Sequence, residues 1–237
     1  MNWSAPLDFY CERTDAAFWS EPFNAATNAA FLVAAALAFR RWRAAGGGDP
    51  AVLALICVVV AVGIGSFLFH TVATRWALYA DVVPIQLFIV GYFLLAVRRF
   101  AGLGRWTGLA ATAAFLLLAR ELPGLTPSWL RGGSGYLGGL VALFGLGSLL
   151  AAEIGRGPPA GLSADAQRAA GLSLIVTGVV FLASLTARSF DLQACRYLFT
   201  GTHPVWHILN AVVLYRLLAL ATGTRAVKRA FTARREL

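Results

Sequence analysis

The residues best suited to chemistry are three histidines, two of which lie four positions apart at 203 and 207. On a helix, positions i and i+4 share one face with Cβ atoms about 5–6 Å apart, so two imidazoles there can hold one metal ion. His70, the third, lies near the end of another apolar run. Three imidazoles that leave one coordination position open are typical of catalytic Zn²⁺, although copper or iron accepts the same ligands. We predict a zinc site made by His70, His203 and His207.

Two further residues, Asp81 and Ser66, could take part in catalysis at such a site. A zinc ion polarises a carbonyl oxygen and moves the pKa of a bound water towards neutral pH. Asp81 would hold that water and pass its proton to a leaving group, or it would instead orient a histidine N–H. Ser66, one turn before His70, would reach the water or a developing oxyanion, or it would simply pack beside Gly63 and Gly65. The pair at 203 and 207 has no glutamate in the next position, which excludes the HExxH protease helix.

Apolar blocks long enough to cross a bilayer must position these residues. The chain of 237 residues is 59% hydrophobic and 13% charged, whereas soluble domains are about 45–50% apolar and about 25% charged. A spanning helix needs about 20 apolar residues. We predict an all-α, integral membrane bundle of seven transmembrane helices that forms a single domain over residues 1–237. The expected spans are 23–40, 51–73, 79–97, 106–120, 134–154, 168–187 and 203–222.

The two ends of the chain are not expected to span. Residues 1–22 are acidic and aromatic, and we expect them to form an ordered interfacial flap. They lack the basic start and apolar core of a signal peptide, so the first span is expected to direct insertion. Residues 223–237 read as a basic tail.

Orientation follows from the basic residues in the loops. The side that holds the tail carries 13 Lys and Arg and the other side six, which predicts a cytoplasmic C-terminus and an outside N-terminus. The 13 are Arg40, Arg41, Arg43, Arg98, Arg99, Arg105, Arg156, Arg168, Arg225, Lys228, Arg229, Arg234 and Arg235. The six are Arg13, Arg75, Arg120, Arg131, Arg188 and Arg196. This topology and attraction to anionic lipid account for the net charge of +9 without nucleic acid as a partner.

The same topology places the candidate residues at one membrane depth. The second span ends outside near His70, the third begins there before Asp81, and the seventh begins there with His203. Ionisable residues inside a bilayer are costly and usually face the bundle interior. We therefore expect these groups to meet near the outer face. The Ala- and Arg-rich composition suggests a bacterial inner membrane, with the site towards the periplasm.

At these residues the sequence resembles the alkaline ceramidase family, within the wider superfamily of seven-span hydrolases that includes the adiponectin and progestin receptors. The matching pieces are Ser66 and His70 four apart, Asp81 in the third span, and His203 and His207 in the seventh. The N-terminal segments 10–12 and 18–28 are also similar to that family. The resemblance covers residues 8 to about 222.

The resemblance implies a hydrolase that cleaves the amide of ceramide-like N-acyl sphingoid lipids into a fatty acid and a sphingoid base. It implies zinc on the three histidines, with Ser66 and Asp81 as catalytic partners. It also implies a calcium site in the N-terminal segment, with oxygen donors of the kind that Ca²⁺ prefers. The candidate calcium ligands are Asp8, the Tyr10 carbonyl, Glu12, Asp15 and Glu21.

The calcium segment departs from the family pattern. Phe9 stands where the family has a carboxylate, and Thr14 where it has an asparagine. Two alternatives to calcium stay open: a solvated acidic N-terminus, and partial replacement of the cation's charge by Arg13. The family also pairs a cysteine in this segment with one before the last span, which implies a disulfide between Cys11 and Cys195. Free thiols are the alternative.

Two other functions remain open at the level of sequence. One is a receptor-like or lipid-binding seven-helix protein in which zinc is structural and Asp81 supplies a fourth ligand. The other is a hydrolase of a different lipid amide or ester, because many bacteria lack ceramide. In each case we expect the partner to be a membrane lipid.

Overall fold

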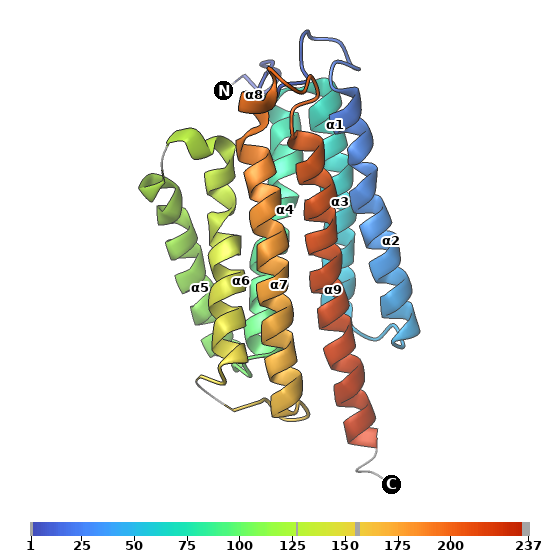
Figure 1. Ribbon diagram of the computed structural model, residues 1–237. Helices are drawn as coiled ribbons and strands as arrows, with labels where there is room; N and C mark the ends of the chain where they lie inside the picture. The colour runs from blue at the N-terminus through green and yellow to red at the C-terminus, as the bar shows by residue number, and fades with distance from the viewer. Residues whose placement is uncertain (1, 127, 155–156, 234–237) are drawn as a thin grey trace.

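The helices of the protein run up and down as one bundle, with the first and last described residues at opposite ends (Figure 1). The computed structural model describes residues 2–126, 128–154 and 157–233. Within them no strand forms, and the pairing of Pro6 with Thr74 is an isolated bridge. The first helices are α1 (Pro22–Thr27), α2 (Ala29–Ala44), α3 (Pro50–Val72), α4 (Arg75–Arg99) and α5 (Arg105–Glu121). The 3₁₀ turns η1 (Leu122–Leu125) and η2 (Ser128–Tyr136) follow, then α6 (Leu137–Ala151), α7 (Ala164–Ser189), α8 (Asp191–Ala194) and α9 (His203–Ala233).

Seven helical stretches in the described residues are long and apolar enough to cross a membrane, so the predicted number of spans is confirmed. Many large side chains on their outer faces are apolar and exposed, including Val33, Leu87 and Leu117. Lipid solvates such a surface, whereas water would not. The structure is therefore consistent with an integral membrane protein.

The ends of the spans differ from those expected. They run over Pro22–Ala44, Pro50–Val72, Arg75–Arg99, Arg105–Leu125, Gly133–Ala151, Ala164–Ser189 and His203–Thr224. The first span is two helices that meet at Asn28, and the sixth begins earlier because Ser163 caps its first turn by accepting from the Ala166 N–H at 3.2 Å. The predicted tail is helical to Ala233, in continuation of α9.

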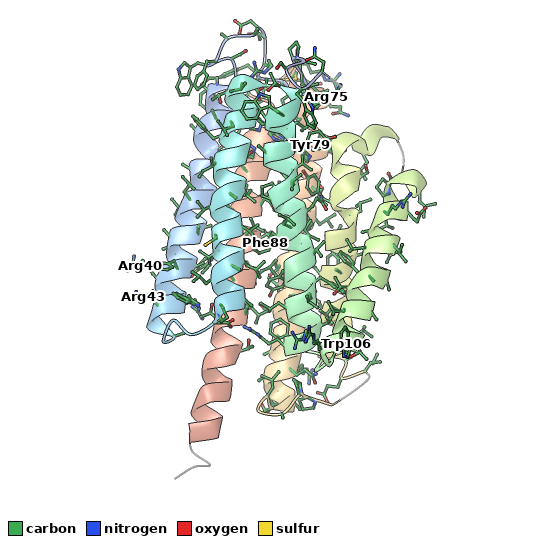
Figure 2. The ribbon with its side chains drawn as sticks, turned by 180° about the vertical axis from the view of Figure 1, so that it is seen from behind. Arg40, Arg43, Arg75, Tyr79, Phe88 and Trp106 are labelled. Carbon is green, nitrogen blue, oxygen red and sulfur yellow. A yellow bond between two sulfur atoms is a disulfide. The ribbon has the colours of Figure 1, made fainter. Side chains whose placement is uncertain are left out.

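Three of the basic residues used to predict the orientation can be located in Figure 2. Figure 2 shows Arg40 and Arg43 near one end of the bundle and Arg75 and Tyr79 near the other. Arg156, Arg234 and Arg235 lie outside the described residues.

The packing of α3 against α4 positions two of the candidate residues. A Cβ on Gly65 would collide with the backbone carbonyl of Ala80, so only glycine permits this approach. The next residue on α3 is Ser66, and the next on α4 is Asp81. Close contact of the two backbones therefore brings the Ser66 hydroxyl to the Asp81 carboxylate.

The N-terminal segment crosses the end of the bundle that carries α1 and α8 (Figure 1). The Leu7 N–H donates to the Ala73 carbonyl at 2.8 Å, and the Arg75 N–H donates to the Ala5 carbonyl at 3.2 Å. A disulfide joins Cys11 to Cys195, with Cα atoms 5.5 Å apart. These bonds tie the segment to the α3–α4 turn and to the chain before α9, so it lies across this end of the bundle.

Candidate metal centre

The three histidines come together in the interior of the bundle. Their ligand atoms lie within 4.8 Å of one another, and His70, His203 and His207 are at most 1% exposed. Each has a buried ring nitrogen without a hydrogen-bond partner among the described residues: Nε2 of His70, Nδ1 of His203 and Nε2 of His207. Buried polar atoms are almost always paired, so three unpaired imidazole nitrogens at one point suit a metal ion. The donor set fits Zn²⁺.

Glu21 and Thr27, at the start of the first span, each contact the Nδ1 atom of one of the histidines. The Glu21 carboxylate lies 2.5 Å from His70 Nδ1, and the Thr27 hydroxyl lies 2.8 Å from His207 Nδ1. Partners of this kind fix the tautomer and ring orientation of a metal-ligating histidine. In both cases the partner occupies Nδ1 and leaves Nε2 free to face the centre.

Arg13 completes the support of Glu21. Its Nε donates to Glu21 Oε1 at 2.5 Å, and its two Nη atoms donate to the carbonyls of Asp15 and His70 at 3.1 Å each. Burial alone would raise the pKa of Glu21, but the bond and charge of His70 and the charge of Arg13 outweigh it, and the pKa falls below its usual value. Glu21 is therefore an ionised partner of both groups.

Asp81 and Ser66 lie beside the histidines. Both are buried, and the Ser66 hydroxyl donates a hydrogen bond to the Asp81 carboxylate. Asp81 is not one of the group whose ligand atoms lie within 4.8 Å of one another. It is thus placed next to the centre and not at the position of a fourth ligand.

Asp191 on α8 sets the start of α9 and therefore the position of His203. Its Oδ1 accepts the N–H groups of Thr202 and His203 at 2.8 Å, and its Oδ2 accepts the Cys11 N–H at 2.9 Å. A carboxylate at a helix N-terminus satisfies free N–H groups and the helix dipole. Gly201 (φ +62°) makes this turn, where a Cβ would collide with Asp191 and Cys11.

The predicted calcium ligands are not gathered into one group within the described residues. Asp8 and Asp15 are exposed, and the oxygens of Glu12 accept the N–H groups of Phe23 and Asn24 at 2.6 and 2.8 Å. Burial raises the pKa of Glu12 despite these two donors. The Arg13 guanidinium lies against Glu21, where a cation would lie. The calcium site stays a prediction, and the arrangement favours the alternative in which Arg13 supplies the charge.

Sequence reasoning missed several residues that shape the centre. Thr27 lies in the N-terminal stretch quoted for the family resemblance, yet nothing in its spacing points to His207. Asp191 gave no signal, because it lies in a short polar connection. The Tyr10 ring, expected to matter only through its carbonyl, stacks on His203 with ring centroids 3.8 Å apart.

A small apolar cavity of about 60 Å³ lies in the bundle core. Its walls come from α4, α6, α7 and α9, and include Ile85, Phe88 (labelled in Figure 2), Leu143, Phe181 and Leu214. Asn210, three residues after His207, is a polar member of the lining. The cavity therefore comes within about one helical turn of His207 along α9.

Replacing Glu21 by glutamine is expected to weaken zinc binding by about 10–100-fold. The substitution removes the charge that faces His70 Nδ1 and leaves Arg13 without its carboxylate. Competition with a chelator of known zinc affinity measures the effect on purified protein.

Glu12→Gln is the matched control, because Glu12 is also a buried carboxylate of this segment. Its oxygens cap α1, and none of its hydrogen bonds among the described residues is to a histidine. Its zinc affinity should stay close to that of the parent protein. Equal weakening by both substitutions would mean that Glu21 acts only through the fold of the segment.

No protein-family model matches this chain, and no curated protein is significantly similar to it.

Proposed function

We propose that the protein is a zinc-dependent intramembrane amidase that hydrolyses ceramide-like N-acyl sphingoid lipids to a fatty acid and a sphingoid base. The observation that carries the proposal is the buried convergence of three unpaired imidazole nitrogens beside a carboxylate and a hydroxyl. The resemblance of Ser66, His70, Asp81, His203 and His207 to the alkaline ceramidase pattern supplies the substrate class.

His70, His203 and His207 would hold the zinc ion, and a bound ion would polarise the amide carbonyl and favour ionisation of the attacking water. Asp81 takes up a proton from that water and passes it to the amide nitrogen as the C–N bond breaks. Water thus supplies OH to the acyl carbon and H to the amine. The Ser66 hydroxyl donates to Asp81, so we assign it to orienting that carboxylate.

The apolar surroundings support a lipid substrate. The acyl chain would follow the cavity between α4, α6, α7 and α9, and would widen it by turning lining side chains such as Phe88 and Leu143. The distribution of Lys and Arg supports an outside N-terminus and a cytoplasmic C-terminus. In a bacterial inner membrane the site would then face the periplasm.

A structural zinc site in a receptor-like protein is the less favoured alternative. A closed zinc site takes four protein ligands. Within the described chain the close group contains three histidines, and Asp81 lies outside it. Three ligands with a neighbouring carboxylate are the arrangement of a site that keeps a position for substrate.

The proposal is tested by incubating purified protein with a panel of N-acyl lipids and lipid esters, with zinc, with a chelator, and with zinc restored. We expect fatty acid to be released from N-acyl sphingoid bases, to stop with the chelator and to return with zinc. Mass spectrometry of the free acid measures the release.

Two outcomes would contradict parts of the proposal. If fatty acid were released only from non-sphingoid amides or from esters, the proposed substrate class would be wrong, but the protein would still be a hydrolase. Absence of release from every lipid would overturn the hydrolase and favour the receptor-like alternative.

A further inference from the structure

Arg188, in the last turn of α7, is a cation that the proposed reaction does not use. Its Nε is buried and has no hydrogen-bond partner among the described residues, and none of the ion pairs between described residues includes it. A basic residue in a last helical turn often serves only the helix dipole. Such a residue normally keeps its charged head in water, whereas Arg188 is half-buried as a residue and its Nε lies inside the protein.

Three aromatic rings from different parts of the chain enclose the guanidinium. Its Cζ lies 5.6 Å from the ring centroid of Tyr10, 5.2 Å from that of Tyr136 and 5.2 Å from that of Trp206. Cations are attracted to aromatic faces at these distances. Burial raises the pKa of Tyr10 above its usual value, so this ring stays neutral. The enclosure therefore holds the charge of Arg188 in place without neutralising it.

This enclosed cation adjoins the histidine centre. Tyr10 contacts Arg188 and also stacks on His203. The guanidinium lies within electrostatic range of Asp81, His203 and His207. With a divalent ion on the histidines, two positive groups would lie close together in this part of the bundle, with the Asp81 carboxylate near both. Their combined field favours an anion there.

We propose that Arg188 is the second half of a carboxylate-binding site whose first half is the histidine centre. The planar guanidinium matches a carboxylate and binds it through charge-assisted hydrogen bonds. The apolar cavity lies next to this enclosure, because the ring of Phe181 in its wall is 6.1 Å from the ring of Trp206. The ligand is therefore an amphiphile with its carboxylate at Arg188 and its chain among Ile85, Phe88 and Leu214. The inference rests on the proposed function, because a fatty acid is the product of that reaction.

Two sources could supply this carboxylate: the released fatty acid, or a head-group carboxylate on an N-acyl amino acid. Calorimetric titration of the zinc-loaded full-length protein with oleate, N-oleoylglycine and oleyl alcohol distinguishes them. The Asp81→Asn background prevents turnover of N-oleoylglycine during the titration. The variants are Arg188→Gln and Arg188→Lys. The control is Arg196→Gln, because Arg196 also lies over an aromatic ring, that of Tyr197, but on an exposed turn.

We expect Arg188→Gln to weaken oleate binding by about tenfold or more, with no change for oleyl alcohol, because one charge-assisted contact is lost. The affinity of Arg188→Lys for oleate should lie between those of the parent and of Arg188→Gln. The affinity of Arg196→Gln should equal that of the parent. Weakening of N-oleoylglycine alone would assign the site to a head-group carboxylate. Unchanged binding of both carboxylates, or equal weakening of the alcohol, would overturn the inference. If the protein bound carboxylates selectively but hydrolysed none of the lipids, the carboxylate site would be supported and the proposed amidase function would be wrong.

Discussion

Asp81→Asn should leave zinc bound and lower the rate of fatty-acid release by about 10²–10⁴-fold. Asparagine has nearly the same shape as aspartate but cannot take a proton from water and return it to the leaving amine. The hydrogen bond from Ser66 can persist to the amide oxygen, so the packing of α3 on α4 should be unchanged. Zinc content by atomic emission and initial rates of acid release measure the two effects separately.

Asp49→Asn is the matched control for this substitution. Asp49 is also a buried carboxylate, but it caps α3 at the opposite end and pairs with Arg99 at 2.8 Å. Asparagine is an equally good helix cap, so zinc content and turnover should both remain near those of the parent. Loss of zinc in Asp81→Asn would instead make Asp81 a ligand of a structural site. Full turnover in that variant would exclude Asp81 from the chemistry.

His203→Ala should remove zinc almost completely and abolish hydrolysis. The imidazole is one of three converging ligands, and two histidines alone hold zinc far less tightly than three. Asp191 caps α9 through the backbone N–H of residue 203, which alanine retains, so the helix should still begin at the same place. Zinc content, hydrolysis and thermal stability in detergent together test the assignment.

Asn210→Ala serves as the control on the same helix. Asn210 is buried near His207 and its Nδ2 is unpaired within the described chain, yet amides are poor zinc ligands. This variant should keep its zinc. If His203→Ala bound zinc as tightly as the parent, the centre would be an unligated histidine cluster and the proposed reaction would lose its metal.

The spans and the histidine centre could be predicted because they follow from local and strongly constrained signals. Apolar blocks of membrane length must become helices, since lipid offers no partner for an open backbone. Ionisable residues in such blocks face the interior, and helix order brings His70, Asp81 and His203 to one end. Boundaries were less accurate at Asn28 and Ser163, because breaks and caps depend on single contacts.

The partners of the site could not be predicted in the same way. Glu21 meets His70 across 49 residues, and Thr27 meets His207 across 180. From the sequence, Arg188 was predicted to be one of the basic loop residues that set the orientation. Nothing in the sequence near it indicates that three aromatic rings surround it. No periodicity encodes such pairs; they arise only when the N-terminal segment folds over the end of the bundle.

Sequence alone determined that this is an all-helical chain with seven membrane-length spans. It also determined that the three histidines lie at the same end of the bundle. The energetic reason is that uncovered charge and unpaired backbone are costly in lipid. Tertiary structure decided how the histidines are held: which atoms orient each imidazole, that Arg13 pairs with Glu21, and that Arg188 is enclosed beside the centre. Those choices depend on distances of a few ångströms between segments far apart in the chain.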